Sequence, residues 1–349
     1  MTEIIKLDKD NPDINLIEIA AYTIRNGGLV AFPTETVYGI GANSFNERAI
    51  MKIFQAKGRP QDNPLIIHVS DIKTVNELVD KIPVKAKILM DKFWPGPLTL
   101  IFKKSSKVPI ANTAGLDTVA IRMPSNKIAY LLIKEAGVPI SAPSANISGR
   151  PSPTDAVHVI EDLEGKVDII IDGGSCDVGV ESTVIDLTVE TPMILRPGAI
   201  TKAMIEKFIG KVNIDPTILG VQNNNLKPKS PGMKYKHYSP NAEVYIVNGE
   251  LEKVVKKIKD LTEEQLKKGK KVGIMATVQT STKYEKGEII VVGDRSKPDT
   301  IAKNLFRVLR DFDKKGVDVI YSEGFQYEEI GLAIMNRLEK AAGYKEIYV

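Results

Sequence analysis

The sequence predicts an α/β or α+β protein, with a twisted mixed sheet in a larger first domain and a parallel sheet in a small second domain. Between residues 15 and 210, short apolar runs typical of strands alternate with segments of helical spacing. After residue 240, strands and helices alternate again, as expected of a parallel sheet with crossover helices. We therefore expect a first domain over residues 1–210, a linker over 211–240 and a second domain over 241–349.

Local spacing justifies the elements of the first domain in order. Apolar residues recur at helical spacing from Ile17 to Ile24, and the helix ends at Gly27-Gly28, a C-terminal cap signal. A second helix begins after its cap Asn46 and ends near Lys57. Strands are predicted at 29–32, 65–69, 98–102, 118–122, 138–141, 167–171, 182–187 and 193–195, and helices near 73–80, 84–93, 126–136 and 155–163.

The linker and the second domain follow. Residues 223–232 are rich in Asn, Lys, Pro and Gly and lack a core pattern, so they read as a connection. The end of this linker carries Met233, Tyr235, His237 and Tyr238, bulky groups that a spacer does not need, which predicts a lid that closes over a site and excludes water. In the second domain we expect strands 243–247, 271–276, 289–292 and 317–321 and helices 251–268, 299–314 and 332–342.

Composition excludes several classes of protein. The formal charge of the 349 residues is only +4, which argues against a basic nucleic-acid-binding block. The single cysteine, Cys176, excludes an internal disulfide and a Cys-rich zinc site. We find no signal peptide and no apolar run that approaches a membrane span, so we expect a cytoplasmic protein.

Two pairs of polar residues predict a site for a polyanion. Lys57 and Arg59 are separated by one residue, as are Ser144 and Asn146, so in an extended segment both members of a pair point the same way. Lysine and arginine supply fixed positive charge, and serine and asparagine supply neutral donors that complete the hydrogen-bond shell of a phosphate. A nucleotide is the ligand that these pairs favour.

Two further residues have competing interpretations. Arg122 ends the apolar run 119–121, where it could hold the carboxylate of a ligand or form a structural salt bridge with Asp117 or another carboxylate. His68 lies in an apolar strand, and a lone histidine there is more often a satisfied core residue than a ligand. Cys176 has no nearby histidine or second cysteine in the sequence and is interpreted as structural.

The sequence lacks the common catalytic motifs. No Gly-x4-Gly-Lys-Ser/Thr loop, His-Glu-x-x-His motif or Gly-x-Ser-x-Gly elbow occurs, and the three histidines have no metal-ligand spacing. From the residues alone, the expectation is a phosphate-rich ligand and a carboxylate ligand in a site without an obvious covalent nucleophile.

Several motifs resemble the YrdC domain over about residues 15–210. They are Phe32–Gly39, Lys57-Gly58-Arg59 with Asn63-Pro64-Leu65, Trp94–Thr99, Ser144-Ala145-Asn146 and Gly179–Thr183. The segment Pro231–Pro240, followed by a small α/β domain, is similar to the long, two-domain form of the threonylcarbamoyl-AMP synthase family. The resemblance implies a YrdC-like catalytic domain, a linker that serves as an active-site lid and a small Rossmann-like C-terminal domain.

The resemblance also implies a nucleotidyltransferase reaction. ATP, L-threonine and bicarbonate (or CO2) would give threonylcarbamoyl-AMP and pyrophosphate, and a partner transferase would pass the threonylcarbamoyl group to adenosine 37 of tRNA. By the same resemblance, the catalytic residues that cradle the phosphates are Lys57, Arg59, Ser144 and Asn146. Further nucleotide contacts are implied for Asn63, Thr118, Ser152, Arg196 and Tyr235, and threonine contacts for Thr36, His68, Arg122, Ala142 (through its backbone) and Ser182.

The implied cofactor is Mg²⁺, which would enter with ATP and be held mainly by phosphates and water rather than by a protein site. Contact with tRNA is expected to be indirect or weak. Two alternatives remain: an RNA-binding YrdC protein, and the YrdC module of a carbamoyl transferase. The balanced charge disfavours the first alternative, and the single cysteine disfavours the second because such assemblies resemble chains with Cys-rich zinc motifs.

Overall fold

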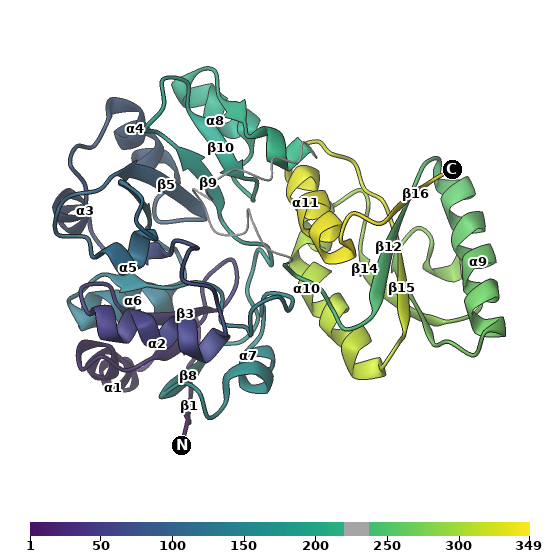
Figure 1. Ribbon diagram of the computed structural model, residues 1–349, viewed down its shortest axis with the longest axis horizontal. Helices are drawn as coiled ribbons and strands as arrows, with labels where there is room; N and C mark the ends of the chain where they lie inside the picture. The colour runs from purple at the N-terminus through teal and green to yellow at the C-terminus, as the bar shows by residue number, and fades with distance from the viewer. Residues whose placement is uncertain (220–236) are drawn as a thin grey trace. The chain divides into compact units, whose positions relative to one another are not determined.

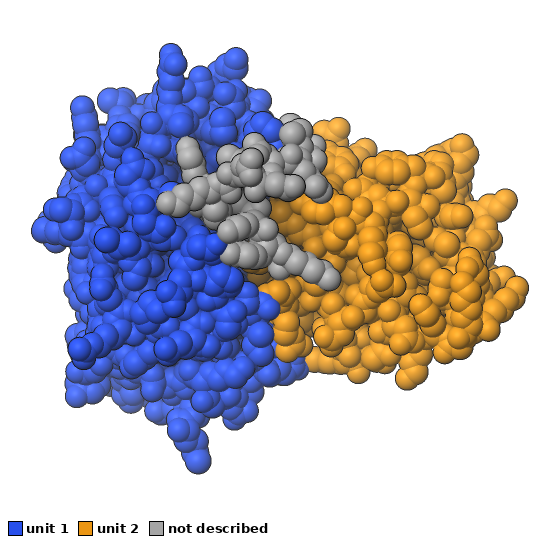
Figure 2. All heavy atoms as spheres, viewed as in Figure 1, with its two compact units in different colours: residues 1–148, 153–177, 181–234 blue, residues 149–152, 178–180, 235–349 orange. Residues whose placement is uncertain are grey.

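The computed structural model describes residues 1–219 and 237–349, which divide into two compact units (Figure 2). The described part of unit 1 comprises residues 1–148, 153–177 and 181–219. Unit 2 comprises residues 149–152, 178–180 and the described residues from 237 to the C-terminus. None of the described helices is long and apolar enough to cross a membrane.

Unit 1 is built on a mixed sheet of eleven described strands, in the order β1-β8-β2-β3-β7-β4-β6-β5-β9-β10-β11 (Figure 1). The strands are β1 (Glu3–Lys6), β2 (Val30–Phe32), β3 (Gly39–Asn43), β4 (Ile66–His68), β5 (Leu98–Lys103), β6 (Thr118–Arg122), β7 (Ile140–Ser141), β8 (Ile169–Asp172), β9 (Thr183–Asp186), β10 (Met193–Arg196) and β11 (Asn213–Ile214). The helices are α1 (Ile14–Arg25), α2 (Glu47–Lys57), α3 (Ile72–Leu78), α4 (Val84–Phe93), α5 (Ile110–Thr113), α6 (Lys127–Ala136), α7 (Ala156–Leu163), α8 (Lys202–Ile209) and the 3₁₀ turn η1 (Pro216–Leu219).

Alternation of side chains along the strands gives this sheet two apolar faces. Val30 and Phe32 of β2 pack in one cluster with the helices α1 and α6. Ala31, between them, packs in the other cluster with α2 and α7. Because successive strand residues point to opposite faces, one short strand contributes to both layers. The sheet is therefore covered by helices on both sides, which fixes the loops that carry the polar residues.

Unit 2 contains a parallel sheet of five strands in the order β14-β13-β15-β12-β16. Its strands are β12 (Glu243–Asn248), β13 (Val272–Thr277), β14 (Glu288–Gly293), β15 (Val319–Glu323) and β16 (Glu346–Tyr348). Its helices are α9 (Leu251–Lys267), η2 (Ser281–Lys283), α10 (Pro298–Lys315) and α11 (Ile330–Ala342), with α9 on one face of the sheet and α10 and α11 on the other (Figure 1). Within this unit, buried Arg310 of α10 donates two hydrogen bonds to the carbonyl oxygen of Pro151, at 3.1 and 2.7 Å.

The predicted fold class is confirmed, with several short elements added. The mixed sheet and the parallel sheet occur where they were expected, and the helix over 84–93 and the strand over 118–122 have the predicted bounds. The sequence analysis missed β1, β3, α5, α8, η2 and β16. It also treated 211–219 as part of the linker, whereas β11 pairs with β10 there and η1 follows. The predicted lid lies largely in 220–236, outside the described residues, and stays a prediction.

Candidate functional site

A row of buried polar side chains crosses neighbouring strands of the unit 1 sheet. His68 of β4 lies opposite Arg122 of β6, and Arg122 lies opposite Thr99 of β5. The hydroxyl groups of Thr99 and Ser182, the residue before β9, lie 2.8 Å apart. Arg196, at the end of β10, donates to the Ser182 hydroxyl at 3.0 Å. We call these five residues the polar row.

Arg122 is held by the loop that connects β2 to β3. Its Nη2 lies 2.7 Å from Oε1 of Glu35 in an ion pair whose side chains are only 4% and 8% exposed. Its Nη1 donates to the Thr36 hydroxyl at 3.0 Å, and its Nε donates to the Gly96 carbonyl at 3.3 Å. Of the two interpretations of Arg122, the salt bridge with a carboxylate is present in this structure, and the partner is Glu35 rather than Asp117.

His68 is a neutral imidazole in this setting. Burial, with a further contribution from the positive charge of Arg122, lowers the pKa of His68 to about 3. The ring makes an edge-on contact with Phe32, at 6.5 Å between centroids. However, Nδ1 of His68 is buried without a hydrogen-bond partner in the described structure. Burial fits the interpretation of His68 as a core residue, whereas its unbonded Nδ1 fits the interpretation as a ligand.

Unpartnered polar atoms gather around this end of the row. Oε2 of Glu35 and Nδ1 of His68 are buried without a hydrogen bond among the described residues, whereas Oε1 of Glu35 and Nη2 of Arg122 face each other in the ion pair. Buried polar groups are nearly always hydrogen-bonded, so two exceptions in one place need an explanation. A ligand that carries hydrogen-bond donors would satisfy them.

Lys57, Ser144 and Asn146 form a second polar group. Lys57 is the last residue of α2 and is only 2% exposed. Its ammonium donates to the carbonyl oxygens of Ser144 and Asn146, the latter at 2.6 Å, and lies 3.4 Å from Oδ1 of Asn146. The Ser144 hydroxyl donates to the same Oδ1 at 2.6 Å. The structure thus brings together three of the four residues that were predicted to cradle phosphates.

The expected geometry of the Lys57–Arg59 pair is wrong. The two residues do not share an extended segment, because Lys57 ends a helix and Gly58 caps it with a left-handed backbone, φ +60°. Arg59 follows this turn, and its side chain has different partners from that of Lys57: Nη2 of Arg59 donates to the Pro64 carbonyl at 3.3 Å. Gly58 is a position where glycine is needed, since L-residues rarely adopt this φ.

The remaining predicted residues fall in several places. Asn63 is buried before β4, and its Oδ1 has no hydrogen-bond partner in the described structure. Thr118 begins β6, four residues and hence roughly 13 Å from Arg122 along the strand. The Ala142 N–H donates to the Ile66 carbonyl, so its own carbonyl is what a ligand could use. Ser152 belongs to unit 2, and Tyr235 lies outside the described residues.

Sequence reasoning missed Glu35 and Thr99 as site residues. Glu35 entered only within the motif Phe32–Gly39, and Thr99 only within the motif Trp94–Thr99 and the strand 98–102. One signal for Glu35 was available in the sequence: it lies between Thr34 and Thr36, directly after a buried strand, where binding residues are often found. Cys176 is buried as expected of a structural residue, and burial raises the pKa of its thiol well above the ordinary value, which disfavours a nucleophilic role.

Family models match both parts of the chain. The Sua5/YciO/YrdC model, described as telomere recombination, matches residues 22–198. A second model, described as the C-terminal domain of threonylcarbamoyl-AMP synthase, matches residues 200–343. The fold and the matched models define a two-domain protein of the YrdC class.

Curated relatives and a solved structure are similar over nearly the whole length. The threonylcarbamoyl-AMP synthase of Pyrococcus abyssi is 52% identical over 95% of this chain and 96% of its own, and that of Bacillus subtilis is 48% identical over 94% and 93%. The crystal structure of P. abyssi Sua5 complexed with L-threonine covers 100% of both chains with a TM-score of 0.94 and 50% identity. The chain belongs to the threonylcarbamoyl-AMP synthase family, whose members are transferases that make an adenylate from ATP.

Proposed function

We propose that this chain joins L-threonine, bicarbonate (or CO2) and ATP into threonylcarbamoyl-AMP, with the polar row as its threonine site. The amine of threonine forms a C–N bond to the carbon of CO2 and loses a proton; with bicarbonate, water is released. A carbamate oxygen then forms a bond to the α-phosphorus of ATP, and the bond from that phosphorus to the β-phosphate oxygen breaks to release pyrophosphate. This chemistry needs positioning and charge stabilisation rather than a covalent nucleophile.

The observation that carries the proposal is the buried Arg122–Glu35 ion pair with two unbonded acceptors beside it, Oε2 of Glu35 and Nδ1 of His68. The Arg122 guanidinium can bind the carboxylate of threonine while it remains paired with Glu35. The unpaired Oε2 of Glu35 can accept a hydrogen bond from the amine, and neutral His68 can accept one through Nδ1. Thr36 and Ser182 place hydroxyl groups beside Arg122 and Thr99 for the threonine hydroxyl, with the Ala142 carbonyl as a further acceptor.

The Lys57 group and Arg59 would serve the triphosphate. The Lys57 ammonium donates to the carbonyl oxygens of Ser144 and Asn146. Its proposed role is therefore to hold this loop in place and to supply positive charge. Arg59, Ser144 and Asn146 would then contact phosphate oxygens, and Asn63 and Thr118 the nucleoside. Ser152 and Tyr235 remain proposed nucleotide contacts by resemblance. Arg196 was also expected to contact the nucleotide, but it bonds Ser182, so we propose that it links the two substrates.

Mg²⁺ would accompany ATP, ligated mainly by phosphates and water. Among the described residues, no group of three or more His, Cys, Asp or Glu side chains could hold a metal ion, so the proposal assigns no protein cage to it. When bound, the ion would neutralise the charge of the triphosphate during the attack on the α-phosphorus. The product would pass to a tRNA threonylcarbamoyl transferase in the cytoplasm, with at most indirect contact between this chain and tRNA.

The test supplies the full chain with ATP, threonine and bicarbonate and measures pyrophosphate together with the adenylate by mass spectrometry. We expect both products in equal amounts, and none when threonine is left out. Pyrophosphate without the adenylate would contradict the proposal. Tight, salt-dependent binding of RNA with no binding of ATP in calorimetry would favour the RNA-binding alternative.

A further inference from the structure

Unit 2 contains a cavity at the carboxyl ends of its parallel strands. β13 and β15 are neighbours in the sheet, but the chain leaves β13 toward β14 at one edge and leaves β15 through α11 toward β16 at the other. Open α/β sheets bind ligands at such a switch point, outside the carboxyl ends of the strands. The cavity here has a volume of about 410 Å³, within the range of small-molecule sites. All residues that line it belong to unit 2.

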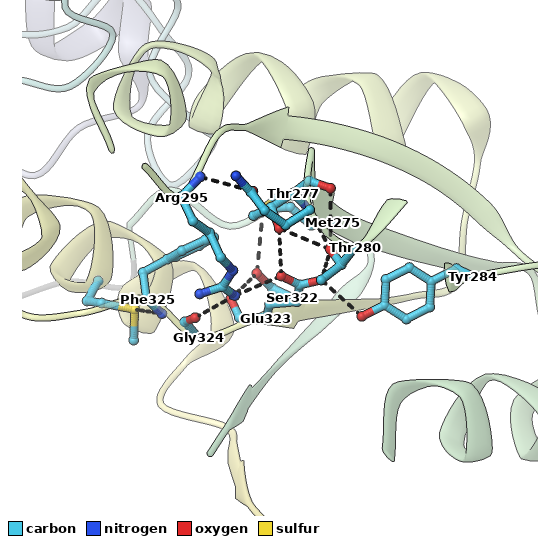
Figure 3. A network of polar contacts seen from close by, with 11 residues as sticks. Met275, Thr277, Thr280, Tyr284, Arg295, Ser322, Glu323, Gly324 and Phe325 are labelled. Carbon is cyan, nitrogen blue, oxygen red and sulfur yellow. Dashed lines mark hydrogen bonds and ion pairs between the residues drawn. The ribbon is translucent and has the colours of Figure 1, made fainter. Parts of the chain in front are cut away.

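A buried carboxylate holds Arg295, one of the residues that line this cavity, through the network of polar contacts in Figure 3. Glu323, the last residue of β15, is fully buried. It accepts hydrogen bonds from four side chains: Thr277 at 3.1 Å, Tyr284 at 3.0 Å, Arg295 at 2.7 Å, and Thr280. Burial, and next the charge of Glu323, raise the pKa of Tyr284, which keeps its hydroxyl a donor. Such a fully bonded carboxylate can fix a cation in one position.

That cation is Arg295, which lines the cavity. Its Nη2 also donates to the Gly324 carbonyl at 3.1 Å, and its guanidinium carbon lies 5.2 Å from the centroid of the Phe325 ring. The side chain is 25% exposed, and its Nε is buried without a hydrogen-bond partner in the part of the chain that the structure describes. The guanidinium is therefore held in place with donor capacity left for a ligand that carries an anionic acceptor.

The rest of the lining suits an anion attached to an apolar, planar body. Ile301, Phe325 and Ile334 provide apolar wall, while Gln326 and Glu328 provide polar groups at the rim. Pro298 and Gly331, in the first turns of α10 and α11, also line the cavity. These helices have 18 and 13 residues, and in neither does the N-cap side chain hydrogen-bond the first backbone N–H groups. Helix N-termini favour anionic groups, and here they add to a site already defined by Arg295 and the cavity.

We propose that this cavity is a second, separate ligand site that binds a mononucleotide. Its phosphate would bind Arg295, its base would pack against Phe325 with the buried Ile301 and Ile334 behind it, and Glu328 would accept a hydrogen bond from a ribose hydroxyl or a base amine. Because no residue of the polar row or the Lys57 group takes part, the site is independent of the proposed synthesis of the adenylate.

The experiment uses the full chain with ¹³C-labelled isoleucine methyl groups and titrates it with AMP, GMP, CMP and UMP. Inorganic phosphate and adenosine are titrated separately. We expect at least one monophosphate to shift the Ile301 and Ile334 methyl signals saturably, with at least tenfold tighter binding than either phosphate or adenosine. No saturable shift with any monophosphate would overturn the proposal, and so would phosphate binding as tightly as the nucleotides, which would show an anion site only.

Charge variants at the rim test the proposal without disturbing Glu323. Gln326→Glu, at an exposed position, adds a negative charge that repels the phosphate and should weaken nucleotide binding about tenfold. Glu328→Gln removes a negative charge but keeps an acceptor oxygen, so nucleotide binding should be as tight as in the parent protein or tighter. Tighter binding by Gln326→Glu than by Glu328→Gln would contradict the proposal. Arg295→Gln should abolish the shifts, while Arg307→Gln on an exposed part of α10 is the matched control. Synthase turnover should be unchanged in Gln326→Glu, so failure of this site and failure of the synthase assignment are distinguishable.

Discussion

The guanidinium of Arg122 and the carboxylate of Glu35 form a buried ion pair that joins the end of β6 to the loop after β2. Removing one partner of a buried pair leaves an uncompensated charge, which typically costs about 3–5 kcal/mol. This loop also supplies Thr36, which bonds Arg122. The pair therefore sets the position of both the cation and the hydroxyl in the proposed threonine site.

Glu35→Gln should lower the free energy of unfolding of unit 1 by about 3 kcal/mol, because Arg122 loses its counter-charge inside the protein. Threonine should recover more stability in this variant than in the parent protein, since its carboxylate supplies the missing anion. Urea unfolding followed by the fluorescence of Trp94, the single tryptophan, measures both effects. Glu77→Gln at an exposed ion pair is the control. An equal gain from threonine in both proteins would contradict a carboxylate site at Arg122.

Arg59→Ala should reduce turnover roughly a hundredfold, since loss of one charge-assisted contact to a developing charge costs about 2–4 kcal/mol of transition-state stabilisation. Release of pyrophosphate under saturating substrates measures the effect. Arg48→Ala, at an exposed position in the first turn of α2, controls for loss of a positive charge away from the site. Near-normal turnover of a folded Arg59→Ala protein would remove Arg59 from the phosphate site.

Substrate analogues should reveal a pocket that reads the threonine hydroxyl. A site built to bond a hydroxyl leaves buried polar groups unpaired when the ligand lacks it, which costs up to about 10⁴-fold in kcat/KM, whereas a missing methyl group costs about 10–200-fold. We therefore expect the order threonine, serine, 2-aminobutyrate. Ser182→Ala should narrow the gap between threonine and 2-aminobutyrate. Equal rates for these two substrates in the parent protein would show that no such pocket exists.

Local pattern predicted most elements of the fold, but not the assembly of the site. The helix over 84–93 and the strand over 118–122 were found because their spacing and flanking signals are local. β3 was missed because Gly39 and Gly41 give it a weak strand propensity, and pairing with β2 and β7 creates it. Likewise, the Arg122–Glu35 pair depends on contacts between segments distant in sequence, which spacing does not encode.

The pH dependence of stability should carry the signature of His68. Its folded pKa of about 3 lies below the ordinary value of 6.5, so between these values the unfolded chain binds a proton that the folded chain does not. The contribution of His68 to stability is therefore complete above pH 6.5 and is lost as the pH falls toward 3, at up to about 1.4 kcal/mol per pH unit. His68→Gln removes this group, so the advantage of the parent protein over the variant should shrink by about 2 kcal/mol between pH 7 and pH 5. Urea unfolding at pH 7, 6 and 5 measures the difference, and Thr99→Val, a neighbouring change without a titrating group, should run parallel to the parent. Parallel curves for the parent and His68→Gln would mean that the folded protein protonates His68 as readily as the unfolded chain does.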